Sequence, residues 1–279
     1  MSQSAFVTRF APSPTGWLHR GHAYSALTAF DAAREAGGRF LLRIENIDTG
    51  RCRPHFEQGI YEDLAWLGVS WETPVRRQSE HPQDHAAALG NLRDRGLLYR
   101  CFRTRSEVLD EIARAPHGRT QAYRGEALAA ADEARLMAEG RPFAWRLSLT
   151  EAERALAGFS NLWFEETGVG RVAAEPAIAG DVILARKDLG VAYHLAVVVD
   201  DALQGVTHVI RGEDLREATH TQRLLQALLE LPTPIYRHHR LLLRPDGKRF
   251  AKRDEAETLR DLRARGVTPT ELREAIERP

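Results

Sequence analysis

The first hundred residues combine short apolar runs with longer stretches of helical spacing. Residues 5–11 (AFVTRFA) form an apolar run that is typical of a buried strand. A turn rich in proline and glycine follows, and then a helix-forming run extends from Gly21 to about Ala36. The Gly37-Gly38 pair ends that run. The pattern therefore predicts a strand, a turn and one helix.

The same order of elements repeats directly afterwards. Residues 39–46 (RFLLRIEN) are a second apolar strand, and residues 53–68 show apolar side chains at helical spacing. Residues 76–80 (RRQSE) are expected to form a loop, which leads into a helix over residues 81–95. A strand–helix–strand–helix order predicts an α/β fold with a parallel sheet.

The middle of the chain has a different pattern, which predicts an insertion into this fold. Residues 101 to about 180 are rich in Ala, Arg and Glu and show little strand signal. The segments 143–149 (FAWRLSL) and 161–170 (NLWFEETGVG) are expected to be strands of a small separate unit. Strongly apolar, β-branched segments return over residues 191–215.

These patterns divide the chain into four parts. Residues 1–100 are expected to be the first half of an α/β domain, and residues 101–186 an insertion subdomain. Residues 187–243 are expected to be the second half of the α/β domain, and residues 244–279 a loop with a C-terminal helical segment.

The composition fits a folded chain that works in the cytoplasm. Hydrophobic residues make up 43% and charged residues 28% of the chain, and no apolar run approaches the ~20 residues that a membrane span needs. The start of the chain lacks the basic-then-apolar order of a signal peptide, and two cysteines make no disulfide framework. The net charge of zero removes the simplest argument for nucleic-acid binding, although a neutral chain can still carry a basic face.

A candidate anion site lies where the first strand joins the first helix, in residues 9–22 (RFAPSPTGWLHRGH). The first N–H groups of a helix are unpaired and the helix dipole favours negative charge there. Gly21 would let a nucleotide approach the backbone, and His19 and His22 can donate hydrogen bonds to phosphate oxygens. A turn with two surface histidines is the alternative that this segment alone leaves open.

Four segments occur in an informative order: 11–22 (APSPTGWLHRGH), 41–48 (LLRIENID), 193–215 (YHLAVVVDDALQGVTHVIRGEDL) and 240–254 (RLLLRPDGKRFAKRD). Together they resemble the signatures of the class I aminoacyl-tRNA synthetases in their glutamyl form, including the HIGH and KMSKS motifs. The resemblance covers nearly the whole chain. It implies a Rossmann-like nucleotide-binding domain with a parallel sheet, interrupted by an insertion subdomain that resembles an acceptor-binding unit.

The resemblance also implies an activity. The family activates L-glutamate with ATP and Mg²⁺ to form glutamyl-adenylate. Full glutamyl-tRNA synthetases carry a large C-terminal anticodon-binding region, whereas this chain ends about 26 residues after Arg253. The chain is therefore similar to stand-alone paralogues without an anticodon-binding domain, which attach glutamate to queuosine at the wobble position of tRNA(Asp). A monomer is expected.

Two sets of binding residues follow from the resemblance. Glutamate would be bound by Arg9, Ser13, Glu45, Tyr193 and Arg211. ATP would be bound by His19, Gly21, His22 and Lys252, and the motif loop would comprise Arg249, Phe250, Ala251, Lys252 and Arg253. The residue types suit these roles, because an arginine fork binds a carboxylate through two parallel hydrogen bonds and a glutamate can pair with the α-ammonium.

The chain departs from the family pattern at three places. The loop reads RFAKR where the family has a serine in third position, and Val197 stands where discriminating glutamyl enzymes often place a polar residue. Relatives also carry a zinc site in the insertion, but only Cys101 and Tyr123 remain, while Arg103 and Ala127 replace the other ligands. Since structural zinc takes four ligands, no zinc is expected.

Three other functions stay open on the sequence. The chain could be a truncated glutamyl-tRNA synthetase that charges a 3′ end. It could be an inactive paralogue that binds RNA or glutamate as a regulator, which the altered RFAKR loop would favour. A small-molecule nucleotidylyltransferase, which shares an HxGH turn, is disfavoured by the residues that would bind glutamate.

Overall fold

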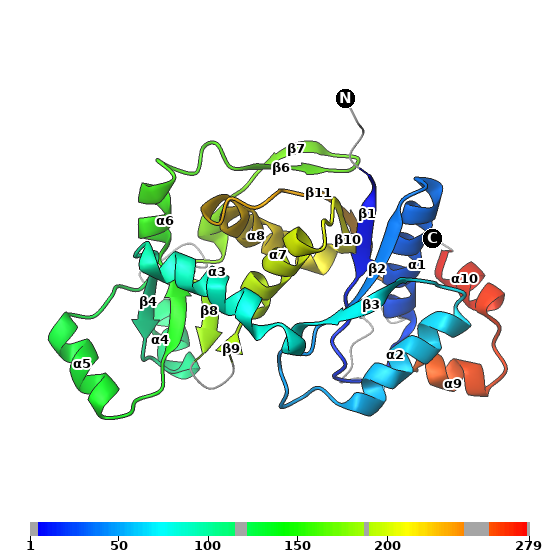
Figure 1. The fold of residues 1–279 in the computed structure, drawn as a ribbon, viewed down its shortest axis with the longest axis horizontal. Helices are drawn as coiled ribbons and strands as arrows, with labels where there is room; N and C mark the ends of the chain where they lie inside the picture. Colours follow the sequence, from blue (N-terminus) through cyan, green and yellow to red (C-terminus); the bar gives the residue numbers. More distant parts are fainter. Residues whose placement is uncertain (1–4, 115–121, 187–189, 243–256, 278–279) are drawn as a thin grey trace.

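A parallel sheet lies at the centre of the computed structural model, which describes residues 5–114, 122–186, 190–242 and 257–277. Its first part has the order β1–β2–β3 and consists of β1 (Val7–Phe10), β2 (Arg39–Ile44) and β3 (Glu72–Arg77). All three strands run parallel (Figure 1). This arrangement confirms the α/β fold predicted from the alternating pattern.

Four further strands extend this part of the molecule. They have the order β10–β11–β6–β7, with bounds β10 (His208–Gly212), β11 (Ile235–His239), β6 (Trp163–Glu166) and β7 (Gly170–Ala173). The two parts meet edge to edge at Val7, whose carbonyl accepts from the Thr207 amide at 2.9 Å and whose amide donates to Thr207 Oγ1 at 2.8 Å. Strand β11 is parallel to both β10 and β6.

The pairing of β6 corrects one expectation. The segment 161–170 was expected to belong to a small separate unit, but Glu166 of β6 pairs with Tyr236 of β11. The hairpin β6–β7 is therefore part of the same sheet as β10 and β11. The domain boundaries at residues 101 and 186 stay a prediction.

A separate antiparallel sheet contains the remaining strands, which lie within or next to the expected insertion. It has the order β4–β5–β8–β9, with bounds β4 (Leu98–Cys101), β5 (Ala144–Leu147), β8 (Ile183–Arg186) and β9 (Gly190–Val191). Figure 1 shows this sheet with α4 and α5 on the side of the molecule opposite α1, α9 and α10.

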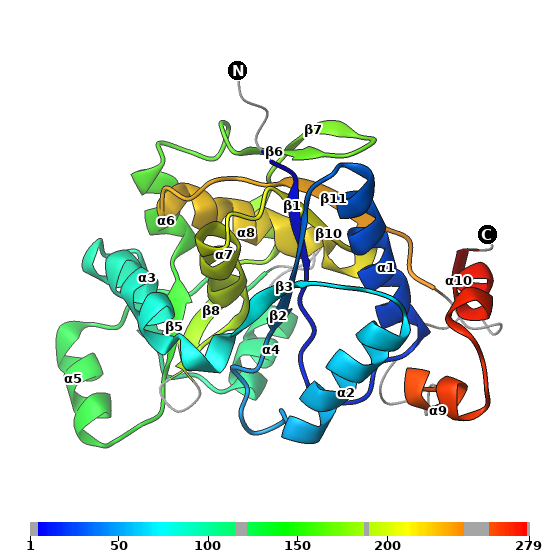
Figure 2. The ribbon, with the colours of Figure 1, turned by 45° about the vertical axis from the view of Figure 1, so that its right-hand side comes forward.

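Helices surround both sheets. Their bounds are α1 (Arg20–Glu35), α2 (Pro54–Trp66), α3 (Pro82–Asp94), α4 (Arg105–Arg114), α5 (Ala130–Ala138), α6 (Leu149–Ala155), α7 (Tyr193–Leu203), α8 (Arg216–Leu228), α9 (Leu259–Ala264) and α10 (Pro269–Glu277). Helix α1 packs on β1, β2 and β10, and α10 packs against α1 (Figure 2). Helices α3 and α8 both pack against α7. No helix in the described ranges is long and apolar enough to span a bilayer.

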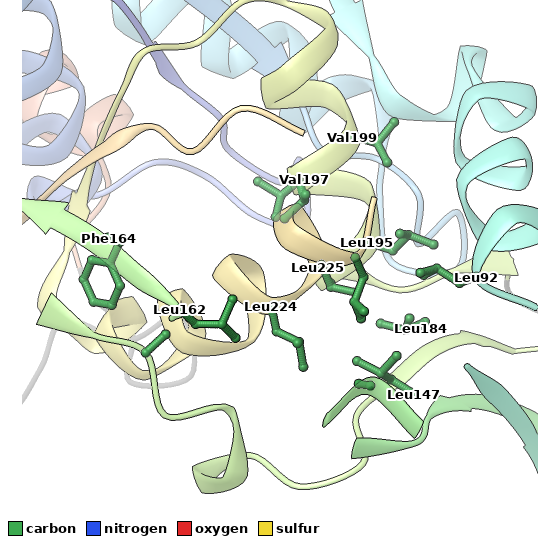
Figure 3. Packing of buried hydrophobic residues seen from close by; sticks show 14 of the residues in the cluster. Leu92, Leu147, Leu162, Phe164, Leu184, Leu195, Val197, Val199, Leu224 and Leu225 are labelled. Atoms are coloured by element: carbon green, nitrogen blue, oxygen red, sulfur yellow. The ribbon is translucent and has the colours of Figure 1, made fainter. Parts of the chain in front are cut away.

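One hydrophobic core joins the antiparallel sheet to helices α7 and α8, as Figure 3 shows. Leu147 and Leu184 of the insertion sheet belong to the same buried cluster as Leu195 of α7 and Leu225 of α8. A fully buried leucine stabilises a fold by about 1.5–3 kcal/mol, so this shared cluster resists separation of the two parts.

Two elements differ from what local patterns suggest. Residues 72–77 form the edge strand β3, although they lack apolar alternation and contain Pro74, which an edge strand tolerates. Helix α7 contains the β-branched run Val197 to Val199, whose members are all buried. Burial of these side chains outweighs their modest preference for strands.

Candidate active site

Two histidines cap the N-terminus of α1. The Nδ1 atom of His19 accepts a hydrogen bond from the Gly21 amide at 3.1 Å, and Nδ1 of His22 accepts one from the His19 amide at 3.2 Å. Their ring centroids lie 3.8 Å apart. Because Nδ1 accepts in both rings, each neutral ring carries its proton on Nε2. The two side chains therefore satisfy the helix end and keep a defined donor atom each.

Gly21 makes room for His19. A Cβ atom at position 21 would lie 3.0 Å from Cε1 and 3.2 Å from Nδ1 of the His19 ring. Any other residue would require this ring to shift by a few tenths of an ångström. The structure thus adds a reason for glycine here that differs from the expected approach of a nucleotide to the backbone.

The described residues on either side of the motif loop lie near this helix terminus. Leu242 lines the same cavity as His19 and His22, and Thr258 forms a backbone bridge with His19. The amide of Leu259 also donates to the Leu18 carbonyl at 2.8 Å. Residues Arg249, Phe250, Ala251, Lys252 and Arg253 lie between these points, outside the described residues.

Arg9 is held by a carboxylate. Its Nε and Nη2 atoms donate to the two carboxylate oxygens of Asp201 at 2.9 and 3.3 Å. Arg43, which is completely buried, donates from Nη2 to Asp201 Oδ1 at 2.5 Å and from Nη1 to Gln204 at 3.0 Å. Burial alone would raise the pKa of Asp201, but Arg9 and Arg43 outweigh burial and lower it.

Glu45 lies at the end of β2, next to this cluster. Its Oε1 atom is 3.7 Å from Nε of Arg43, and only 9% of the residue is exposed. Burial raises the pKa of Glu45 to about 7, although Arg43 and Arg9 act in the opposite direction. A carboxylate of this kind gains from pairing with a bound ammonium group.

Arg211 has a different environment from Arg9. Its Nη2 atom donates to Thr219 Oγ1 at 2.7 Å, and its Nε atom donates to His238 Nε2 at 3.3 Å. Among the described residues, no carboxylate lies within 4.0 Å of its guanidinium, and its buried Nη1 atom has no hydrogen-bond partner. Within the part of the chain that the structure describes, Arg211 is therefore a buried cation without an anion beside it.

A cavity of about 500 Å³ brings the two predicted sets of residues together. Its lining includes the predicted glutamate residues Arg9, Ser13, Glu45, Tyr193 and Arg211 and the predicted ATP residues His19, Gly21 and His22. These residues come from β1, the turn after it, α1, β2, α7 and β10, which are separated by up to about two hundred positions along the chain.

Tyr193 and Ser13 lie where this cavity meets a second one. The second cavity has a volume of about 570 Å³ and shares Ser13, His22, Glu45 and Tyr193 with the first. Burial raises the pKa of Tyr193, so its hydroxyl stays protonated and can donate or accept a hydrogen bond. Val197, by contrast, packs in the core and is not among the described residues that line either cavity.

The remnant of the zinc site does not suit a metal ion. The sulfur of Cys101 lies 3.9 Å from the Tyr123 hydroxyl, and the guanidinium of Arg146 packs 4.5 Å from the centroid of the Tyr123 ring. The other two expected positions are Arg103 and Ala127. Two donors beside a guanidinium do not make the four-ligand set that structural zinc takes. The absence of zinc stays a prediction.

Sequence reasoning missed the residues that hold the two arginines. They are Arg43, Asp201, Thr219, His238 and Glu166. Arg43 and Asp201 stand inside apolar segments of a strand and a helix. A charge in such a segment must have a partner, and this signal could have identified both residues as members of a buried network.

The chain belongs to the class I tRNA synthetases for glutamate and glutamine, because the family described as "tRNA synthetases class I (E and Q), catalytic domain" matches residues 5–279. The predicted family and the class I fold are thereby confirmed. Among its relatives is the glutamyl-Q tRNA(Asp) synthetase of Rhodobacter capsulatus, which is 44% identical, with coverage of 97% of this chain and 99% of that protein.

Longer relatives contain the same region. The glutamate–tRNA ligase 2 of Dinoroseobacter shibae is 39% identical, and the match covers 95% of this chain and 59% of that protein. A solved glutamate tRNA ligase from Elizabethkingia meningosepticum, crystallised in complex with its amino acid, has a TM-score of 0.72 at 29% identity. That match covers 89% of this chain and 52% of the other.

Proposed function

We propose that this protein activates L-glutamate with ATP and transfers the glutamyl group to queuosine in tRNA(Asp). The observation that carries the proposal is the shared cavity, which is lined by the predicted residues of both substrates. The 44% identity to the glutamyl-Q tRNA(Asp) synthetase of Rhodobacter capsulatus supports the choice of acceptor. We also propose that the protein acts as a monomer in the cytoplasm, where tRNA is available.

The charges of the cavity suit glutamate. Among the described residues, Asp201 and ionised Glu45 offset Arg9 and Arg43, and Asp214 and Arg240, which also line the cavity, carry opposite charges, so Arg211 is left as an excess positive charge. Glutamate carries two carboxylates and one ammonium group, so its net charge is complementary. Glutamine carries no net charge and would leave Arg211 without an anion, which costs free energy in a buried site.

The reaction would take place in two steps. The α-carboxylate oxygen of glutamate attacks the α-phosphorus of ATP, and the bond to the pyrophosphate oxygen breaks. The protonated Nε2 atoms of His19 and His22 can stabilise the negative charge that spreads over the phosphate. Mg²⁺ would enter with the phosphates of its substrate. A hydroxyl on the cyclopentene ring of queuosine then attacks the activated carbonyl carbon, its proton is lost, and AMP leaves.

The test begins with pyrophosphate exchange. The protein is incubated with glutamate, ATP and labelled pyrophosphate in the absence of tRNA, and Arg211→Ala serves as the inactive control. Exchange without tRNA is expected. Exchange that requires tRNA would favour a truncated glutamyl-tRNA synthetase, and no exchange under either condition would favour a regulatory paralogue.

Transfer is measured with labelled glutamate on two forms of tRNA(Asp). One form contains queuosine but lacks its 3′-terminal adenosine, and the other contains unmodified guanosine and an intact 3′ end. Label on the first form alone supports the proposal. Label on the second form alone would overturn it and show that the acceptor is the 3′ end.

A further inference from the structure

The guanidinium of Arg211 is oriented by uncharged groups. Thr219 Oγ1 accepts from Nη2 at 2.7 Å, and His238 Nε2 accepts from Nε at 3.3 Å. Thr219 Oγ1 also lies 3.2 Å from His238 Nε2, so the hydroxyl can donate to the ring while it accepts from the arginine. Arg211 is thus fixed at two of its nitrogens without losing its net charge.

The hydrogen bonds define the tautomer of His238. Because Nε2 accepts from Arg211, the ring proton must be on Nδ1. Nδ1 lies 3.1 Å from Oε1 of Glu166 and donates to it. The His238 side chain is fully buried, and burial together with the positive charge of Arg211 lowers its pKa to about 4. The ring is therefore neutral in the working range of pH.

Glu166 reaches this site from a distant part of the chain. It belongs to β6, only 3% of it is exposed, and it also pairs with Nη1 of Arg216 at 2.9 Å. The pairing of Glu166 with Tyr236 fixes its position relative to β11, which carries His238. The resulting chain of contacts runs from Arg216 through Glu166 and His238 to Arg211.

We propose that His238 is a positioning residue, which orients Arg211 toward the side-chain carboxylate of the amino acid substrate without neutralising it. Glu166 holds the His238 ring in the tautomer that accepts from Arg211. The inference rests on the proposed function, since it assumes that the cavity binds glutamate.

The contrast with Arg9 explains why a neutral residue suits this place. Asp201 neutralises Arg9, and a carboxylate in the position of His238 would do the same to Arg211. A neutralised arginine would distinguish a carboxylate from an amide much less well, because its attraction to the carboxylate would be offset. A neutral histidine acceptor orients the Arg211 guanidinium as a carboxylate would, and the positive charge of Arg211 remains available to the substrate carboxylate.

The test uses His238→Leu and His238→Gln. Leucine removes the acceptor, while the amide oxygen of glutamine can reach a position close to that of Nε2. Glutamate and glutamine are compared by kcat/KM in pyrophosphate exchange, and glutamate binding is measured by calorimetry without ATP. His220→Gln is the matched control, because His220 follows Thr219 on α8 but is not among the described residues that line the cavity.

In His238→Leu we expect the KM for glutamate and its dissociation constant to rise about tenfold or more, as for the loss of a hydrogen bond to a charged group. The preference for glutamate over glutamine should shrink by a similar factor, while the KM for ATP changes less than twofold. His238→Gln should recover part of the loss, and Glu166→Gln should show a smaller change of the same kind.

Two results would overturn the inference while the proposed function stands. One is an unchanged preference for glutamate over glutamine in folded His238→Leu. The other is an equal loss for glutamate and ATP with a lower active fraction, which would indicate a structural role. A wild-type protein that neither binds glutamate nor exchanges pyrophosphate would overturn the proposed function itself, and the inference with it.

Discussion

Replacement of Asp201 by asparagine should strongly destabilise the protein. Asp201 is the carboxylate that contacts both Arg9 and Arg43, and all three residues are nearly or completely buried. Asparagine keeps the size of the side chain but removes the negative charge that offsets the two buried guanidinium groups. Breaking a buried ion pair by removing one partner costs about 3–5 kcal/mol, and we expect a loss in this range at pH 7.

The loss should depend on pH in a defined direction. Since the pKa of Asp201 is lowered in the folded protein, its ionisation stabilises the fold above the unfolded pKa of about 4. This contribution disappears as pH falls below that value and through the folded pKa. The difference in free energy of unfolding between wild type and Asp201→Asn should therefore be largest near neutral pH and should decrease toward pH 3.

Asp63 provides a matched control, because its pKa is shifted in the opposite direction to that of Asp201. It is also buried, but neither of its carboxylate oxygens has a hydrogen-bond partner among the described residues, and Arg263 is 3.8 Å away. Burial raises the pKa of Asp63 to about 6. Its ionisation thus opposes folding as pH rises from about 4 through 6, and Asp63→Asn should be at least as stable as wild type at pH 8.

Urea denaturation at pH 3, 7 and 8 measures these free energies of unfolding. Pyrophosphate exchange should also fall in Asp201→Asn, because Arg9 loses the group that orients it. A loss of stability below about 1 kcal/mol at pH 7 would refute the reasoning. If wild type and Asp201→Asn differ as much in free energy of unfolding at pH 3 as at pH 7, the charge of Asp201 is not what stabilises the two arginines.

Three further predictions concern substrate binding and the insertion. The KM for glutamate should rise about tenfold from pH 8 to pH 6, because a Glu45 with a pKa of about 7 loses most of its charge over this range, and the KM for ATP at each pH is the comparison. Asp181→Ala should lower the free energy of unfolding in urea by about 3 kcal/mol, since the Asp181 carboxylate accepts from Tyr99 at 3.0 Å and from two backbone amides at 2.9 Å. A chelator should change the stability of neither wild type nor Asp181→Ala, and a chelator that removes zinc and lowers stability would contradict the expected absence of zinc. Lys252→Ala should slow adenylate formation by a factor of ~10²–10³, because it removes the charge that is expected to bind the phosphates of ATP. Lys248→Ala should slow it by a smaller factor, because Lys248 only flanks the motif in the same segment. If pyrophosphate exchange shows the reverse order, the motif has been misaligned.

Contiguous features of this protein could be predicted from its sequence. The strand before residue 11, the turn, the two histidines and helix α1 follow one another along the chain, and each depends on spacing within a few residues. The same holds for Glu45 at the end of β2 and for Arg211 in β10, which stand inside recognisable segments. The family and eight of the residues that line the cavity were therefore accessible without coordinates.

Tertiary structure decided how these residues are held. Asp201 is 192 positions from Arg9, and Glu166 is 72 positions from His238, so no local period relates the members of either pair. Their contacts exist because β6 pairs with β11 and because α7, which packs against α3 and α8, places Asp201 within hydrogen-bond distance of Arg9 and Arg43. The sequence by itself identified eight residues that line one cavity, whereas the order of strands in the sheet decided that Arg9 is paired with a carboxylate and that Arg211, among the described residues, is not.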